Sequence, residues 1–282
     1  MKVPVSWLKE FVPVKAGADE IARRLTLSGF EVEEILTVEG DAVLEVNVTP
    51  NRGDCLSIFG IAREVSAIFH VPLRFPRIEK FAPSKGKSPV TVRLQAAKKC
   101  PRYSLAVLSG VKVGSSPDRL ARRLAQVGIR SINNVVDVTN YVLMELGQPL
   151  HAFDRKKIRG EKILVRKARN QEKILTLDGE ERELISDDLV IADSEGAIAL
   201  AGIMGGKDTE IDENSTTAAL ESAFFESSGI RKTARRLGIQ TESSYRFERG
   251  IDPEGVIRKI YDAVNPEAHP KEVLADARAL GI

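Results

Sequence analysis

The chain has 282 residues, of which 43% are hydrophobic and 29% are charged, and these shares are typical of a globular protein with well-formed cores. The length favours roughly two domains. The formal net charge of +2 is only weakly basic, so it neither requires nor excludes a nucleic-acid partner, and local patches must decide.

The location of the protein is indicated by its cysteines and by its apolar runs. Cys55 and Cys100 lie far apart, which favours free thiols in a reducing compartment over a disulfide scaffold. The first residues lack the apolar core of a signal peptide, and the longest uncharged run, residues 196–206, is too short to span a bilayer. We therefore expect a cytoplasmic protein without membrane contact.

The first block, residues 1–75, is expected to form a small α+β domain. Apolar residues at helical spacing predict a helix over Asp19–Leu27, and alternation of apolar and polar residues predicts a strand over Val43–Val48. A second helix with one apolar face is predicted from about Ile58, and Asp54 is expected to cap its beginning.

Residues 76–90 are rich in proline and are expected to be a linker to a second block, residues 91–250. In that block, short strands are predicted at residues 90–94, 103–108, 163–165, 174–177, 189–192 and 197–201. Helices are predicted over residues 117–127, with Pro117 at the first position, over Asn134–Leu146, and over Gly229–Leu237 with Ser228 as its cap. This irregular order favours an α+β fold over a doubly wound sheet. A helical tail is expected over residues 251–282.

One carboxylate is the most informative residue of the second block. Glu221 lies in the otherwise apolar stretch Ala218–Phe225, which is typical of a buried strand. A buried charge is costly unless it has a partner or a task. Either a basic residue or backbone donors satisfy this carboxylate, or it accepts a hydrogen bond from a ligand hydroxyl.

Other polar residues and glycines near this stretch are candidates for the same site. His151 is expected in a turn after a buried helix, where it is either structural or functional. Gly205 and Gly206 follow an apolar run, so they form either a simple turn or a place where a ligand approaches the backbone. Thr139 and Asn140 lie in an apolar helix and either bond to the backbone or point into a pocket.

A basic ridge is predicted on the third helix of the second block, and it is formed by Arg231, Lys232, Arg235 and Arg236. Such a ridge is either a solvated face or a phosphate-binding surface. The three histidines are scattered and match no cysteine spacing, so no metal site is predicted. The chain also lacks a P-loop and a Rossmann fingerprint.

Several long motifs occur in one order along the chain, and they are found at residues 47–57, 60–64, 136–142, 147–154 and 248–250. Together they resemble the N-terminal part of the β subunit of bacterial phenylalanyl-tRNA synthetase, over most of residues 1 to about 255. The resemblance implies that residues 91–250 form a mixed-sheet editing domain, which hydrolyses tyrosine wrongly joined to the tRNA for phenylalanine.

The resemblance also implies roles for particular residues. The amino-acid pocket would be lined by His151, Gly205, Glu221, Thr241 and Ser243, and Gly206 adjoins it. Within that set, Glu221 and the Gly205 backbone would recognise the tyrosine hydroxyl, and His151 and Thr241 would join Glu221 in catalysis. Near the tRNA terminus or the bound amino acid would lie Arg130, Thr139 and Asn140. If the basic ridge binds phosphate rather than being a solvated face, it would contact the RNA.

Three features depart from the family pattern. The family usually carries a tRNA-binding insertion in the first block, whereas here Thr37 is followed almost directly by Asp41. Family members continue through further domains past the position of residue 255. Ser243 stands where the family usually has alanine.

These departures shape the expected activity. Ligation would need an α subunit, and ATP and magnesium would enter only through a complete synthetase, so this chain itself is expected to use no cofactor. The expected partners are the tRNA for phenylalanine and an α subunit. The alternative is a non-catalytic paralog or a fragment that binds tRNA, an amino acid or a protein.

Overall fold

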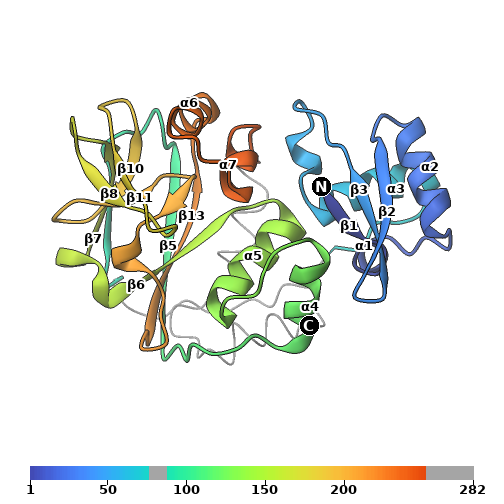
Figure 1. Cartoon of the computed structure of the whole chain (residues 1–282), viewed down its shortest axis with the longest axis horizontal. Coiled ribbons are helices and arrows are strands. Elements are labelled where there is room, and N and C mark those ends of the chain that lie inside the picture. Colours follow the sequence, from blue (N-terminus) through green and yellow to red (C-terminus); the bar gives the residue numbers. More distant parts are fainter. Residues whose placement is uncertain (76–87, 252–282) are drawn as a thin grey trace.

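The protein, described by a computed structural model over residues 1–75 and 88–251, combines helices with mixed and antiparallel sheets (Figure 1). The α+β class predicted from the sequence is confirmed. The linker prediction falls mostly on residues outside these ranges, and so does the helical tail at residues 252–282. Within the described ranges, no helix has the length and apolar character that a membrane span requires.

The elements follow one another in an irregular order. The helices are α1 (Val5–Phe11), α2 (Ala18–Leu27), α3 (Ile58–Phe69), α4 (Asp118–Gln126), α5 (Asn134–Leu146), α6 (Ser227–Leu237) and α7 (Glu242–Phe247). The strands are β1 (Lys2–Pro4), β2 (Val32–Val38), β3 (Asp41–Val46), β4 (Thr91–Leu94), β5 (Arg102–Ser109), β6 (Leu150–Asp154), β7 (Lys162–Lys167), β8 (Lys173–Leu175), β9 (Glu181–Glu183), β10 (Leu189–Ala192), β11 (Ala197–Leu200), β12 (Met204–Gly205) and β13 (Thr217–Phe224).

The N-terminal sheet has the strand order β1-β3-β2, with both pairs antiparallel. A two-residue turn joins β2 to β3, because Val38 pairs with Asp41. Glu39 and Gly40 both have positive φ angles, 50° and 74°, as the type I′ hairpin turn demands. The chain therefore closes with a tight turn at the point where the sequence indicated a missing insertion.

The first hydrophobic core extends beyond the N-terminal block. It joins Trp7, Leu44 and Ile61 to side chains of α4 and α5, and the Trp7 ring stacks on Tyr141 with their centroids 4.7 Å apart. In Figure 1, α5 lies between the strand-rich part and the N-terminal part, and it contacts both α3 and β6. The domain limits 1–75 and 91–250 stay a prediction, and this core crosses them.

The second part is built on two larger sheets around a separate core, and β8 and β9 form a further, two-stranded antiparallel sheet. One sheet has the order β12-β11-β10-β7-β4, in which β4 is parallel to β7 and the other pairs are antiparallel. The other has the order β5-β13-β6 and is antiparallel throughout. The strand β13 is the central strand of its sheet, and most of its side chains are buried.

Three predicted helix starts need correction. Ser57, rather than Asp54, caps α3, since its hydroxyl accepts from the Gly60 amide at 2.9 Å. Glu226, rather than Ser228, caps α6 through the amides of the first turn. Pro117 is the residue before α4 rather than its first residue. In each case the predicted residue lies within a few positions of the true boundary. For α3 and α6, several polar side chains near the boundary can serve as the cap.

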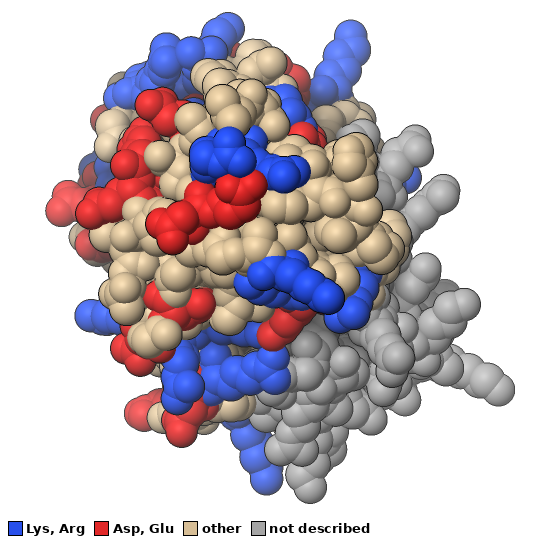
Figure 2. All heavy atoms as spheres, turned by 90° about the vertical axis from the view of Figure 1, so that its right-hand side faces the viewer, with Lys and Arg blue, Asp and Glu red and all other residues tan. Residues whose placement is uncertain are grey.

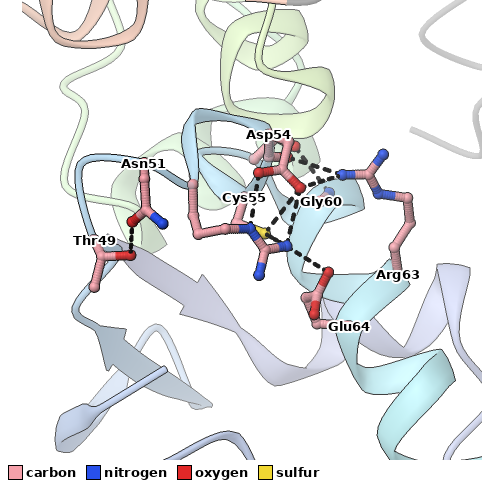
Figure 3. A network of polar contacts seen from close by, with 9 residues as sticks. Thr49, Asn51, Asp54, Cys55, Gly60, Arg63 and Glu64 are labelled. Carbon is pink, nitrogen blue, oxygen red and sulfur yellow. Dashed lines mark hydrogen bonds and ion pairs between the residues drawn. The ribbon is translucent and has the colours of Figure 1, made fainter. Parts of the chain in front are cut away.

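A network of ion pairs stiffens the loop that precedes α3 (Figure 3). Arg52 binds Asp54 at 3.0 Å and Glu64 at 2.7 Å, and Arg63 binds the same Asp54 at 2.9 Å. A Cβ on Gly53 would lie 2.7 Å from the Gly250 carbonyl oxygen, so only glycine fits where this loop meets the chain after α7. The stiffened loop therefore docks against the end of α7.

Another buried carboxyl, that of Glu145, lies on α5 next to Tyr141 of the first core. Glu145 is 2% exposed, and one of its oxygens, Oε2, has no hydrogen-bond partner among the described residues. Burial raises its pKa from 4.5 to about 7, although a hydrogen bond with Tyr141 opposes this rise. Glu145 therefore takes up a proton on folding at intermediate pH.

Replacing Glu145 with glutamine should make stability less dependent on pH. Because the folded pKa is raised, wild-type stability should fall as pH rises from about 4.5 to 7 and then level off. The free energy of unfolding of Glu145→Gln, relative to that of the wild type, should therefore rise by up to about 3 kcal/mol between pH 4.5 and pH 7. Urea unfolding at pH 4.5 and pH 8 measures the gain, with the exposed Glu181→Gln as the control. A gain that is equal at both pH values would contradict this assignment.

Candidate functional site

Glu221 lies on the central strand β13, where β5 and β6 flank it, as the apolar sequence predicted. Its side chain is 7% exposed, and its nearest neighbours on the same face of β13 are Ala219 and Ala223. Such small, apolar neighbours cannot balance a charge. The carboxylate must therefore find its partners on other strands or in a cavity.

The partner that the structure provides is a phenol. The Tyr103 hydroxyl donates to Glu221 Oε2 at 2.7 Å, and it is the one side chain among the described residues that does so. Burial raises the pKa of Glu221 from 4.5 to about 7, and the Tyr103 hydrogen bond lowers it. The carboxyl thus changes its protonation near neutral pH, and among the described residues neither a basic side chain nor a backbone amide satisfies it.

His151 lies directly opposite Glu221 in the pairing of β6 with β13, and not in the turn that the sequence predicted. Its Nε2 atom is buried without a hydrogen-bond partner in the described structure. Its ring packs edge-on against the Phe153 ring, with the two ring centroids 4.4 Å apart. Burial lowers its pKa from 6.5 to about 4. The imidazole is therefore neutral at pH 7 and offers a free nitrogen.

The two glycines predicted near the site have different positions. A Cβ on Gly205 would lie 2.4 Å from His151 Cε1, so this glycine lets the imidazole pack against strand β12. A Cβ on Gly206 would lie 2.5 Å from the Ile198 carbonyl oxygen, and Gly206 forms a bridge with Thr176. Gly206 therefore serves the packing of the sheet and does not line the cavity described next.

A cavity of about 390 Å³ lies between α5, β6, β12 and the beginning of α7. Seven of the residues predicted for the site line it, namely Thr139, Asn140, His151, Gly205, Glu221, Thr241 and Ser243. The exposed Arg130 is not among the lining residues, although nearby Ile132 and Asn133 are. The volume falls within the range of small-molecule sites, and much of the lining is apolar.

The hydroxyl groups of this lining are already hydrogen-bonded to the backbone. Thr241 caps α7, because its Oγ1 accepts from the Ser244 amide at 3.0 Å and donates to the Ile203 carbonyl at 2.9 Å. Ser243 Oγ donates to the Gly202 carbonyl at 3.1 Å, and Thr139 Oγ1 to the Val136 carbonyl at 2.7 Å. These side chains therefore fix the shape of the wall, and Ser243 directs its extra hydroxyl to the backbone.

Four polar residues in or beside the cavity were not predicted from the sequence. Asn133, Glu210 and Glu242 line the cavity, and Tyr103 holds Glu221 from strand β5. The sequence contained a signal for α7, since Thr241 and Ser244 form a capping box with the usual spacing. For Tyr103 there was no local signal, because its contact with Glu221 depends on how β5 pairs with β13.

The basic ridge lies on α6, outside the cavity lining. Arg231, Lys232 and Arg235 are exposed, whereas Arg236 forms an ion pair with the buried carboxylate of Asp188. Because of this ion pair, Arg236 has a structural role, which leaves three cations of the ridge for a ligand.

A different face of the molecule, the N-terminal one, is shown in Figure 2. There, groups of basic and acidic side chains alternate, with uncharged surface between them.

One group of possible metal ligands occurs in the described chain, formed by Asp54, Cys55 and Glu64. Figure 3 shows Asp54, Cys55 and Glu64 close together. The Arg52 guanidinium lies among their ligand atoms, with Nη2 3.0 Å from Asp54 Oδ2, 3.0 Å from Cys55 Sγ and 2.7 Å from Glu64 Oε1. Burial raises the pKa of the Cys55 thiol to about 12, which disfavours a thiolate ligand. We assign this group to the ion-pair network.

Substituting Gly205 should disturb the site through His151. A Cβ would overlap the imidazole, whose ring is held by Phe153, so Gly205→Ala should lower the free energy of unfolding by about 1–3 kcal/mol. Gly114→Ala is a matched control, because nothing lies within 4 Å of its added Cβ and its φ is not positive. Urea unfolding compares the two variants, and equal stabilities would contradict the close packing of His151 on Gly205.

Comparisons with known proteins identify the family to which this chain belongs. Residues 99–265 match the family described as the B3/4 domain. The β subunits of phenylalanine–tRNA ligase from Anaeromyxobacter dehalogenans and Aquifex aeolicus are 53% and 50% identical to this chain over 235 and 230 residues. Each match covers 82% of this chain and 29% of the relative.

A solved structure is also similar in part. It is an N-terminal fragment of the phenylalanyl-tRNA synthetase β subunit from Pyrococcus horikoshii, with 18% identity and a TM-score of 0.43, and the match covers 79% of this chain and 67% of that one. The chain belongs to the B3/4 domain family and is similar to part of the β subunit of phenylalanine–tRNA ligase.

Proposed function

We propose that this chain hydrolyses tyrosine that has been joined wrongly to the tRNA for phenylalanine. The observation that carries the proposal is the Glu221 carboxylate, which is buried in the wall of a cavity and whose described side-chain partner is a single phenol. Tyrosine differs from phenylalanine by one hydroxyl. A buried acceptor for that hydroxyl is the feature that a tyrosine-selecting site needs.

The physical need for a second site supports this proposal. A pocket shaped for phenylalanine rejects an analogue with one added hydroxyl by only about 100-fold. A site that must hydrogen-bond the hydroxyl separates the two amino acids by roughly 10⁴ to 10⁵. With phenylalanine bound, the carboxylate of Glu221 would lose solvent and gain no donor, so this ligand would be disfavoured.

His151 and Thr241 provide the polar groups for hydrolysis in this proposal. The unpartnered Nε2 of His151 would bind the attacking water or the ester, as a neutral imidazole can. Thr241 would fix the beginning of α7 and so the wall against which the ester lies. An aminoacyl ester is activated, so a positioned water would suffice without a covalent intermediate. The terminal hydroxyl of the tRNA would be free to assist.

Replacing Glu221 should remove the preference for tyrosine. Glu221→Ala removes the acceptor, and the ratio of tyrosyl-ester to phenylalanyl-ester hydrolysis should fall by about 100-fold or more. The assay is deacylation, by the purified chain, of phenylalanine tRNA charged with either amino acid. The exposed Glu183→Ala serves as the matched control. An unchanged ratio in Glu221→Ala would remove this residue from recognition.

The three exposed cations of α6, together with Arg130 and Asn140, are proposed to meet the RNA. Phosphate contacts release counterions, so reversing Lys232 and Arg235 to glutamate should weaken tRNA binding and flatten its dependence on salt. The logarithmic slope should fall by about one for each phosphate that the variant no longer binds. Filter binding across a salt series measures this slope.

The control is reversal of Arg23, which forms an ion pair with Glu20 on α2. Equal slopes for the α6 variant and the wild type would assign the α6 ridge to a solvated face. Folded protein that binds tRNA without hydrolysing either ester would support a non-catalytic binding role instead. Association with an α subunit, and through it with ATP and magnesium, stays a prediction.

A further inference from the structure

We propose that Tyr103 is a positioning residue that fixes the Glu221 carboxylate so that its other oxygen, Oε1, receives the hydroxyl of the ligand. The inference rests on the proposed function and adds to it a residue outside the cavity. Tyr103 does not line the cavity, whereas Glu221 does. The carboxylate thus lies between a phenol of the protein on one side and the space for a ligand on the other.

The strand pairing explains how Tyr103 reaches this carboxylate. Tyr103 of β5 lies opposite Ala223 of β13, and Ala223 and Glu221 lie on the same face, two residues apart. Tyr103 and Glu221 are therefore diagonal neighbours, a spacing that long aromatic side chains can bridge. The hydroxyl closes this distance with a 2.7 Å hydrogen bond to Oε2.

Fixing one oxygen determines where the other can point. A glutamate has several rotatable bonds, and a free carboxylate would sample several orientations in a cavity of about 390 Å³. With Oε2 held by Tyr103, a ligand phenol finds Oε1 already in place. Preorganisation of this kind increases selectivity, because the ordering cost is met before the ligand binds.

The same hydrogen bond favours the charged carboxylate. Burial raises the pKa of Glu221 to about 7, and Tyr103 opposes this by donating to the ionised form. The other titratable groups that face Glu221 are His151 of β6, which burial keeps neutral, and Cys100, whose thiol pKa is raised to about 12. Among the described residues, no cation stabilises the charged form of Glu221 together with Tyr103. Removal of the Tyr103 hydroxyl should therefore raise the pKa of Glu221.

Removing only the hydroxyl tests the inference. In Tyr103→Phe, preference for the tyrosyl ester should fall about tenfold at pH 7. At pH 8.5, where Glu221 is ionised again, only the part of this loss that protonation causes should be recovered, and the part that lost positioning causes should remain. The deacylation assay of both esters is run from pH 6 to pH 8.5. Tyr245→Phe on α7 is the matched control, since Tyr245, like Tyr103, does not line the cavity, whereas the donor to Glu221 is Tyr103.

A second readout does not depend on activity. Carbon-13 NMR of labelled glutamate carboxyls, with Glu221 assigned from its loss in Glu221→Gln, should show the Glu221 titration moved to higher pH in Tyr103→Phe. An unchanged titration, or a selective wild type whose Tyr103→Phe variant keeps the same pH profile, would overturn the inference. A wild type that hydrolyses neither ester would reject the proposed function, while the NMR titration would still decide the role of Tyr103.

Discussion

The guanidinium of Arg246 joins three segments of the chain at a point that is 2% exposed. It donates to the Leu56 carbonyl at 2.9 Å, to the carbonyl and the carboxylate of Glu242, and to Met144 Sδ at 3.2 Å. A buried cation is tolerated only with such complete pairing, and burial lowers its pKa. Because these acceptors come from the loop before α3, from α7 and from α5, Arg246 fixes all three together.

The shape of the cavity depends on these contacts of Arg246. Helix α7 begins at the cavity wall with Thr241 and Ser243, and its Arg246 is anchored one turn later to the N-terminal loop. That loop is itself stiff, because Arg52 is bound on two sides and Gly53 packs against the backbone after α7. The described N-terminal block, residues 1–75, contributes no lining residue to the cavity. It stabilises the cavity indirectly, by holding α7 in place.

The parts of this arrangement that follow from local sequence were predicted, and the parts set by tertiary pairing were not. An apolar stretch with one carboxylate placed Glu221 on a buried strand, and helical spacing placed α5 correctly. The strand at His151 was missed, because nearby glycine and proline favour turns while pairing with β13 decides the outcome. Tyr103 is 118 residues from Glu221, and no local pattern spans that separation.

Glu145 and Glu221 show why a perturbed carboxyl does not define a site by itself. Burial raises both pKa values to about 7, and each carboxyl is hydrogen-bonded to a tyrosine. Glu145, however, is 2% exposed and does not line the cavity that Glu221 faces. Glu221 faces a cavity that also contains the unpartnered imidazole of His151. The same electrostatic cost is thus a loss of stability in one place, and in the other it would be, under the proposed function, the origin of selectivity, because there a ligand can donate a hydrogen bond.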